Sequence, residues 1–204
     1  YNELDWKDSL PHRFNDELGF NGNRLSGLGL ILTFDQRDNP NAPTLGFYLN
    51  QRLIQFAQVT GSDFTYTELE WDARAYQTFA DYTLALGGQL KSQHGNVPLL
   101  HLSSQDGTKR FRGIEKGRYR DKNLLSLQSE IRTPLYFWNI GFAAFTDFSQ
   151  VAQTLSHIDG KGWIASFGGG IRYAMNPKEK FNVRVDVGFV DGTPGLVIDV
   201  KEAF

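Results

Sequence analysis

The sequence predicts an all-β protein whose strands form an antiparallel transmembrane β-barrel. Apolar and polar residues alternate strictly over 163–173 and 181–189. This period of two residues is that of strands with one apolar and one polar face. The oily face carries bulky aromatic residues near the segment ends, and the opposite face mixes charged residues with glycine. No segment of useful length shows helical spacing instead. This combination is typical of a barrel wall with lipid outside and a polar lumen inside.

The first half of the chain contains four predicted strands. Residues 1–22 are polar and irregular, so we expect an irregular segment there and place the barrel domain at 23–204. Each predicted strand has apolar residues at every second position, with mainly polar residues between them. The ranges and outward residues are 24–35 (Leu28, Leu30, Leu32, Phe34), 45–56 (Leu45, Phe47, Leu49, Leu53), 64–76 (Leu69, Trp71, Ala73, Ala75) and 81–92 (Tyr82, Leu84, Leu86, Leu90).

A long connection at about 93–122 interrupts the alternation, and five further strands follow it. In 123–133, Leu125, Leu127 and Ile131 point outward, whereas the polar residues between them point inward. The segment 139–150 places Phe142 and Phe148 on one face and Asp147 on the other. The last three predicted strands are 163–173, 181–189 and 195–204.

Strand length and strand number both bear on the barrel prediction. A strand of about 11 residues rises roughly 36 Å, and a 45° tilt reduces this to about 25 Å, the height of the apolar band of an outer-membrane barrel. A closed bacterial barrel normally has an even number of strands, whereas about nine are visible here. Residues 1–22 could hide a tenth strand, one strand could be wrongly divided, or upstream strands could belong to the barrel.

Composition excludes several other classes. The net charge of −2 gives no reason to expect a nucleic-acid partner. The chain has no cysteine, which rules out disulfides and thiolate metal sites. No run approaches the roughly 18 to 20 apolar residues of a transmembrane helix. The sequence shows no secretory signal and starts at Tyr1, so we expect a processed chain or one cut from a larger protein.

Five motifs, in the same order along the chain, together resemble the bacterial surface antigen family of outer-membrane barrels, the assembly and translocation superfamily typified by BamA and TamA. The resemblance extends over about 24–204. The motifs are Phe34-Asp35-Gln36-Arg37-Asp38-Asn39-Pro40 with Gly46-Phe47, Gly61-Ser62-Asp63-Phe64 before Glu70-Trp71, Phe111-Arg112-Gly113-Ile114 followed by Gly117-Arg118-Tyr119-Arg120-Asp121, Phe145-Thr146-Asp147, and Glu202-Ala203-Phe204.

The resemblance implies a specific contact inside the barrel. In the family, the loop that carries the Arg112-Gly113 motif folds back into the lumen, and its arginine meets acidic residues of the inner wall. Those partners would be Glu130 and Asp147, which the alternation independently places inward. Inward glycines would leave room for the loop beside Arg172, Arg184 and Asp186. The alternative is that Arg112 is a solvated loop cation. Phe111 and Ile114 depart from the residues that the family more often has.

The resemblance also implies a function. The chain would be the C-terminal part of a 16-stranded barrel in the outer membrane of a Gram-negative bacterium, inserting, assembling or translocating outer-membrane proteins or lipids. Its surroundings would be outer-membrane lipid and lipopolysaccharide, with client barrel proteins and periplasmic accessory domains as further partners. Phe204 would be a C-terminal sorting signal, unless it is simply an aromatic residue at the end of a strand.

Two other functions stay open, neither of which needs a cofactor. One is a passive barrel that anchors another domain or forms a small channel. The other is a hydrolase at the barrel rim, in which His94 or His101 would act with Asp106. The four histidines fall in different loops, and neither their spacing nor that of the carboxylates indicates a metal site or a catalytic motif. We therefore do not expect an enzyme.

Overall fold

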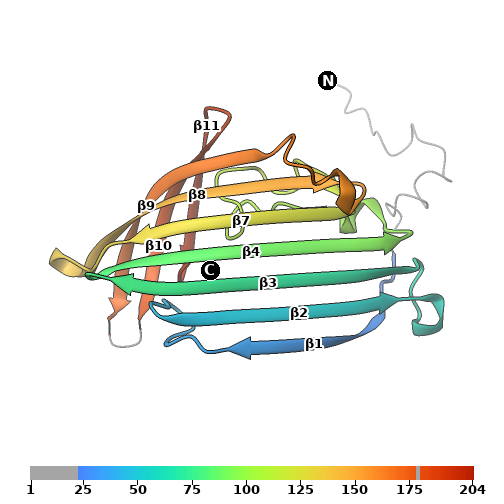
Figure 1. Cartoon of the computed structure of the whole chain (residues 1–204), viewed down its shortest axis with the longest axis horizontal. Helices are drawn as coiled ribbons and strands as arrows, with labels where there is room; N and C mark the ends of the chain where they lie inside the picture. Colours follow the sequence, from blue (N-terminus) through green and yellow to red (C-terminus); the bar gives the residue numbers. More distant parts are fainter. Residues whose placement is uncertain (1–22, 178–179) are drawn as a thin grey trace, which may run out of the picture.

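The computed structural model describes residues 23–177 and 180–204, which form one curved antiparallel sheet with a long loop on its concave side (Figure 1). Nine strands lie in this sheet in chain order. They are β1 (Gly27–Asp35), β2 (Gly46–Phe56), β3 (Tyr66–Phe79), β4 (Tyr82–Gly95), β7 (Asn123–Arg132), β8 (Ile140–Ala152), β9 (Ile164–Asn176), β10 (Phe181–Val190) and β11 (Thr193–Val200).

The predicted all-β, antiparallel fold is confirmed, and each predicted strand corresponds to one observed strand. Within the described residues, β1 and β11 each pair on one side only, so these strands form an open curved sheet. A wrongly divided strand is therefore not the reason for the odd count. The predicted irregular segment 1–22 lies outside the described residues. In the part of the chain that the structure describes, no helix is long and apolar enough to cross a membrane.

Polarity is inverted relative to a water-soluble protein. In β7, Ser126, Gln128 and Glu130 are buried, whereas Leu127 and Ile131 are 45% and 48% exposed. The same alternation continues through the neighbouring strands, because directly paired residues of an antiparallel sheet share a face. The apolar exposed face suits contact with lipid, and the polar face lines the lumen.

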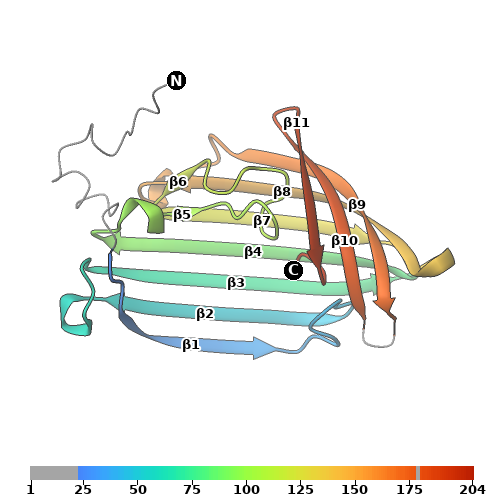
Figure 2. The same ribbon diagram turned by 180° about the vertical axis from the view of Figure 1, so that it is seen from behind.

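The connection between β4 and β7 folds over the concave face instead of extending beyond the strand ends (Figure 2). It begins with the short helix η3 (Leu99–His101), and the two-residue strands β5 (Ser103–Ser104) and β6 (Arg120–Asp121) pair within it. We call residues 105–119, between β5 and β6, the lumen loop. This loop brings charged residues from the middle of the sequence to the polar wall of the sheet.

The end of the chain differs from the prediction that a strand covers 195–204. Strand β11 ends at Val200, and Lys201 takes a left-handed conformation with φ of 69°. The N–H of Lys201 then donates to the carbonyl of Asn182 at 2.7 Å, and that of Glu202 to the carbonyl of Asn41 at 3.0 Å. These bonds turn residues 202–204, which we call the tail, into the interior.

An ion pair joins a turn near one end of the curved sheet to a turn near the other end. The Nζ of Lys180, in the β9–β10 turn, lies 2.7 Å from Oδ2 of Asp38, in the β1–β2 turn. Burial acts to raise the pKa of Asp38, but hydrogen bonds from Lys180, Thr44 and the N–H of Leu45 outweigh it. The pKa of this carboxyl therefore lies well below its ordinary value.

Removing the Lys180 ammonium should raise the pKa of Asp38, because one of the groups that stabilise its carboxylate is lost. A carboxyl whose pKa is lowered by folding stabilises the fold above its unfolded pKa of about 3.9, and that contribution is lost as the pH falls through the folded pKa. We expect Asp38 in Lys180→Ala to titrate at a higher pH than in the wild type, which NMR of the Asp38 carboxyl carbon in micelles would measure. Lys122→Ala is the control, and equal midpoints in all three proteins would contradict the prediction.

Candidate functional site

The lumen loop begins with a tight turn organised by one carboxylate. Oδ1 of Asp106 accepts hydrogen bonds from the backbone N–H groups of Thr108, Lys109 and Arg110, each at 3.0 Å. A short-range acceptor of this kind supplies partners for N–H groups that no strand would bond. The turn therefore presents Arg110 and Arg112 from a fixed backbone.

Arg112 is the centre of the site. Its side chain is fully buried, and Nε and Nη2 donate to the two oxygens of Asp147 at 3.0 and 2.9 Å. Nη1 donates to Glu130, and the guanidinium carbon lies 3.5 Å from the centroid of the Phe145 ring. The planar guanidinium donates two hydrogen bonds to one carboxylate, and the face of the aromatic ring adds a favourable contact with the cation.

The backbone of Arg112 is held by the same wall. Its N–H donates to Oδ2 of Asp147 at 3.0 Å, and its carbonyl accepts a hydrogen bond from the Ser166 hydroxyl at 2.5 Å. Strands β8 and β9 therefore fix the position of the loop as well as the direction of the side chain.

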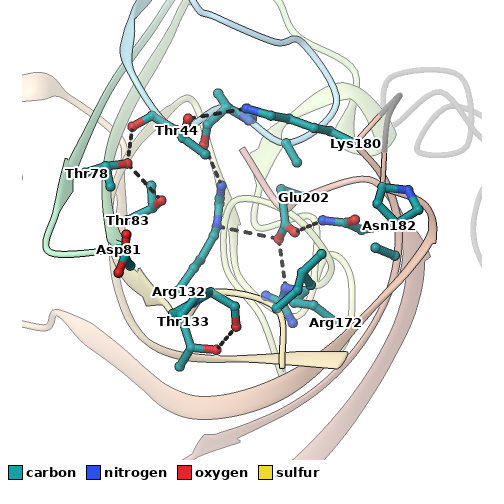
Figure 3. Close-up of a pocket in the computed structure, with 16 residues that line it drawn as sticks. Thr44, Thr78, Asp81, Thr83, Arg132, Thr133, Arg172, Lys180, Asn182 and Glu202 are labelled. Atoms are coloured by element: carbon teal, nitrogen blue, oxygen red, sulfur yellow. Dashed lines mark hydrogen bonds and ion pairs between the residues drawn. The ribbon is translucent and has the colours of Figure 1, made fainter. Parts of the chain in front are cut away.

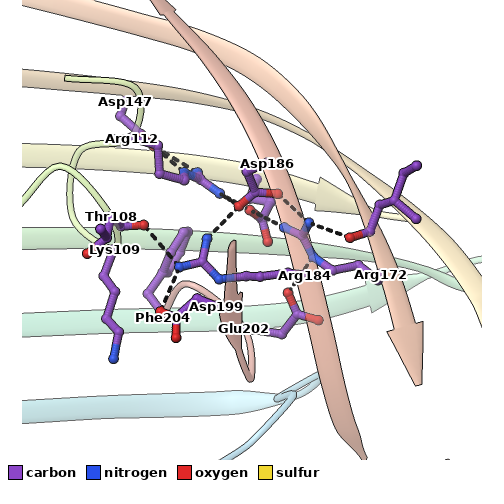
Figure 4. Close-up of polar contacts among 12 residues, drawn as sticks. Thr108, Lys109, Arg112, Asp147, Arg172, Arg184, Asp186, Asp199, Glu202 and Phe204 are labelled. Atoms are coloured by element: carbon purple, nitrogen blue, oxygen red, sulfur yellow. Dashed lines mark hydrogen bonds and ion pairs between the residues drawn. The ribbon is translucent and has the colours of Figure 1, made fainter. Parts of the chain in front are cut away.

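A wider network of buried charges surrounds this arginine (Figure 4). Asp186 of β10 lies 3.7 Å from Nη1 of Arg112 and accepts hydrogen bonds from Arg172 and Arg184. Arg172 also reaches Glu130 at 3.2 Å. Buried charges are tolerated only when they are paired, because an unpaired ion inside a protein costs several kcal/mol. Each of these arginines has at least one carboxylate partner.

Glycine allows the loop to approach the wall closely. Gly113 has φ of +85°, and a Cβ built on it would lie 2.6 Å from the carbonyl oxygen of Gly188. A Cβ on Gly195 of β11 would in turn lie 2.6 Å from the carbonyl oxygen of Gly113. The loop therefore packs against β10 and β11 at backbone distance, at positions where side chains would not fit.

The tail lies at the mouth of the lumen on the side of the β1–β2 and β9–β10 turns (Figure 3). A cavity of about 360 Å³ lies there, and the Glu202 carboxylate lies at its lining between Arg172, at 2.7 Å, and Asn182, at 2.8 Å. Arg132 donates to the carbonyl oxygen of Phe204 at 3.3 Å. The mouth is therefore held by charged contacts between the tail and the wall.

The structure brings Arg112, Gly113, Glu130 and Asp147 into one cluster. It places Phe204 apart from them and inside the lumen, 2% exposed, with its ring 6.0 Å from the Arg112 guanidinium. An aromatic residue at the end of a lipid-facing strand would instead be exposed to lipid. Phe204 therefore does not continue the lipid-facing side of β11, because the chain turns at Lys201.

Sequence reasoning missed one contact of the same loop. Arg110 donates to Asp72 on β3, two strands away from Glu130 on β7, so the loop is bonded to the wall at a second place. The alternation could have indicated this contact. Arg110 and Arg112 lie on either side of Phe111, so in an extended segment both side chains point to the same face. Asp72 lies between the outward residues Trp71 and Ala73, so the alternation places it toward the lumen but gives it no partner.

The hydrolase and metal alternatives gain no support from the geometry. Asp106 is used by backbone N–H groups of its own loop, and His101 lies in the helix η3. Among the described residues, no group of three or more histidine, cysteine or acidic side chains could hold a metal ion.

Comparisons with known proteins give the family and the fold of the chain. The family model of the Omp85 superfamily domain matches residues 2–188. No curated protein matches the chain. The chain is similar to the crystal structure of BamA from Haemophilus ducreyi lacking POTRA domains 1–3, with a TM-score of 0.61 and 16% identity. The match covers 86% of this chain and 40% of that one, and at this identity it shows the fold alone.

Replacing Arg112 with alanine should destabilise the protein strongly. The change leaves Glu130 and Asp147 buried with fewer cationic partners, and breaking such a pair typically costs about 3–5 kcal/mol. Denaturant titration in micelles would measure the free energy of unfolding. Arg118→Ala is the control, because this exposed arginine of the same loop should change stability by no more than about 0.5 kcal/mol. Equal effects of the two changes would show that Arg112 does not anchor the loop.

Adding one methyl group to Gly113 should also loosen the loop. Gly61 is a matched control, because its φ of +86° is nearly the same but nothing lies within 4 Å of its added Cβ. We expect Gly113→Ala to cost about 1–3 kcal/mol more than Gly61→Ala, since overpacking adds to the backbone strain that both share. Faster trypsin cleavage at Lys109 or Lys116 in Gly113→Ala alone would report the released loop. Identical cleavage and stability in the two variants would contradict close packing at Gly113.

Proposed function

Because the chain belongs to the Omp85 superfamily, we propose that it forms part of an outer-membrane barrel that inserts or assembles other outer-membrane proteins. The superfamily comprises insertion and translocation proteins that are not enzymes. The chain spans 40% of the length of the BamA chain that it matches, so the activity of the whole protein is itself part of the proposal.

The observation that carries the proposal is the edge formed by β11. This strand has eight residues, pairs only with β10 within the described residues, and contains Pro194 and Gly195. Its outward residues Leu196 and Ile198 are 64% and 67% exposed. An unpaired strand edge offers a row of N–H and C=O groups, and in lipid each unsatisfied group costs several kcal/mol. An incoming strand could satisfy these groups by pairing with the edge.

The lumen loop supports this edge from the inside. Arg184 of β10 donates to the carbonyl of Thr108 in the loop at 3.0 Å and to Asp199 of β11 at 3.2 Å. Together with the packing of Gly113 on Gly195, these bonds link β11 to a loop that is anchored on β7 and β8. An edge that is braced in this way keeps a defined shape while its outer side stays open to a partner.

The surroundings follow from the exposed face. We propose outer-membrane lipid and lipopolysaccharide as the neighbours of the outward apolar residues, client barrel proteins as the partners of β11, and periplasmic accessory domains as further partners. Phe204, inside the lumen, is proposed as a sorting signal read before the chain folds. A passive barrel is the competing function, but the loop and buried charges occupy the lumen, which does not favour an open channel.

Reconstituted protein should accelerate the folding of a client barrel. We expect liposomes that contain the full-length protein to fold an unfolded outer-membrane barrel faster than empty liposomes, as measured by the shift in gel mobility of folded barrels. Arg112→Ala should reduce the rate, because the loop no longer braces β11, whereas Arg118→Ala should not. Equal rates in empty and loaded liposomes would favour a passive barrel.

The site of contact can be tested separately. A photo-crosslinking residue at Ile198 of β11 should capture the client, and the same residue at Leu127, in the middle of the sheet, should not. Both positions face outward, so equal capture at both would indicate random contact in the membrane.

A further inference from the structure

A second cavity, of about 320 Å³, lies on the other side of the lumen loop from Glu130 and Asp147. It is enclosed by the loop, the β1–β2 turn, the inner faces of β3 and β4, and residues 200–204. Five cations from four different segments line it: Arg37 from the turn, Arg74 from β3, Lys109 and Arg110 from the loop, and Lys201 directly after β11. Figure 4 shows that Lys109 extends away from the Arg112 network.

The acidic residues around this cavity are already engaged, including Glu202 of the tail, which accepts hydrogen bonds from Arg172 and Asn182. Asp72 is a single carboxylate for two guanidiniums, those of Arg74, at 2.6 Å, and Arg110. Glu70 accepts hydrogen bonds from Arg52 at 2.5 Å and Gln89 at 2.6 Å. Asp106, as described above, accepts backbone N–H groups of its own loop. Arg37 has its own partner, Asp35, at 2.7 Å, so Arg74 and Arg110 are the two guanidiniums of the lining that share one carboxylate.

Among the residues that line the cavity, one buried guanidinium nitrogen has no acceptor. Arg110 is 9% exposed, and its Nη1 is buried without a hydrogen-bond partner among the described residues. A buried charged donor without an acceptor is costly, and such a group indicates that an acceptor is missing from the site. The neighbouring guanidiniums are held in place, because Arg37 and Arg74 lie 4.6 and 4.7 Å from the centroid of the Tyr48 ring.

We propose that this cavity binds a phosphate group. Phosphate is tetrahedral, so it offers acceptors to cations that approach from the turn, the strand and the loop at once, and its negative charge compensates the two guanidiniums that share one carboxylate. A planar carboxylate would satisfy fewer of these directions. The volume leaves room for part of the molecule that carries the phosphate. The proposal does not depend on insertion activity.

Binding at this cavity would act on the parts that we propose to brace β11. Arg110 lies two residues from Arg112 on the same loop, and the tail lines the cavity. A bound phosphate would therefore join the β1–β2 turn, the loop and the tail, and would stabilise the folded state in proportion to its occupancy.

Isothermal titration calorimetry of the purified full-length protein in neutral micelles, with inorganic phosphate at constant ionic strength, tests the proposal. We expect saturable binding at one site and at least a roughly tenfold weaker affinity in Arg110→Gln, because a charge-assisted hydrogen-bond donor is lost. Lys122→Gln is the control, since the Nζ of Lys122 binds the carbonyl of Gly95 outside the cavity. If Arg110→Gln does not fold, Arg37→Gln replaces it and should also weaken binding.

Three further ligands identify the source and the chemistry. Competition by glycerol 3-phosphate or by micelles with phosphatidic acid would indicate a lipid headgroup, and binding of inorganic phosphate alone would indicate the free ion. Acetate that binds as tightly as phosphate would overturn the phosphate assignment. The absence of saturable binding, or equal binding by wild type and the arginine variants, would show that the unpaired donor bonds to water. Client folding is measured independently, so either proposal can fail alone.

Discussion

The buried ion pairs of Arg112 are the interaction on which the rest of the structure depends. A guanidinium with no exposure to solvent needs carboxylates within hydrogen-bond distance, and β7 and β8 supply them as Glu130 and Asp147. Meeting that requirement brings the lumen loop against the wall. Closeness to the wall then requires glycine, at Gly113 on the loop and at Gly188 on β10. The charge network and the glycine contacts are therefore two consequences of one constraint.

The loop also connects parts of the sheet that are not neighbours. Arg112 reaches β7 and β8, Arg110 reaches Asp72 of β3, and the carbonyl of Thr108 accepts Arg184 of β10. In an open curved sheet, such links hold the curvature that strand pairing alone leaves free. This is the physical link between the lumen and the proposed function, because the shape of the β11 edge depends on what holds β11 from inside.

Local pattern predicted the strands well and the chain end poorly. Alternation is repeated many times along β7 and β10, so each residue supports the assignment of its neighbours to a face. The turn at Lys201 depends on a single left-handed residue and on the carbonyl oxygens of Asn182 and Asn41, which come from distant segments. No periodicity encodes such a turn. For the same reason the inward position of Phe204 was not foreseen.

The sequence by itself determined which residues face lipid and which face the lumen, because side-chain direction in a strand follows from position alone. Together with the family resemblance, it also indicated that Arg112 belongs with Glu130 and Asp147. Only the tertiary structure decided that Asp186 joins them, that Arg110 faces a second cavity, and that the tail lies at the mouth of the lumen. These contacts join segments far apart in sequence, and their distances depend on how the sheet curves, which no local pattern specifies.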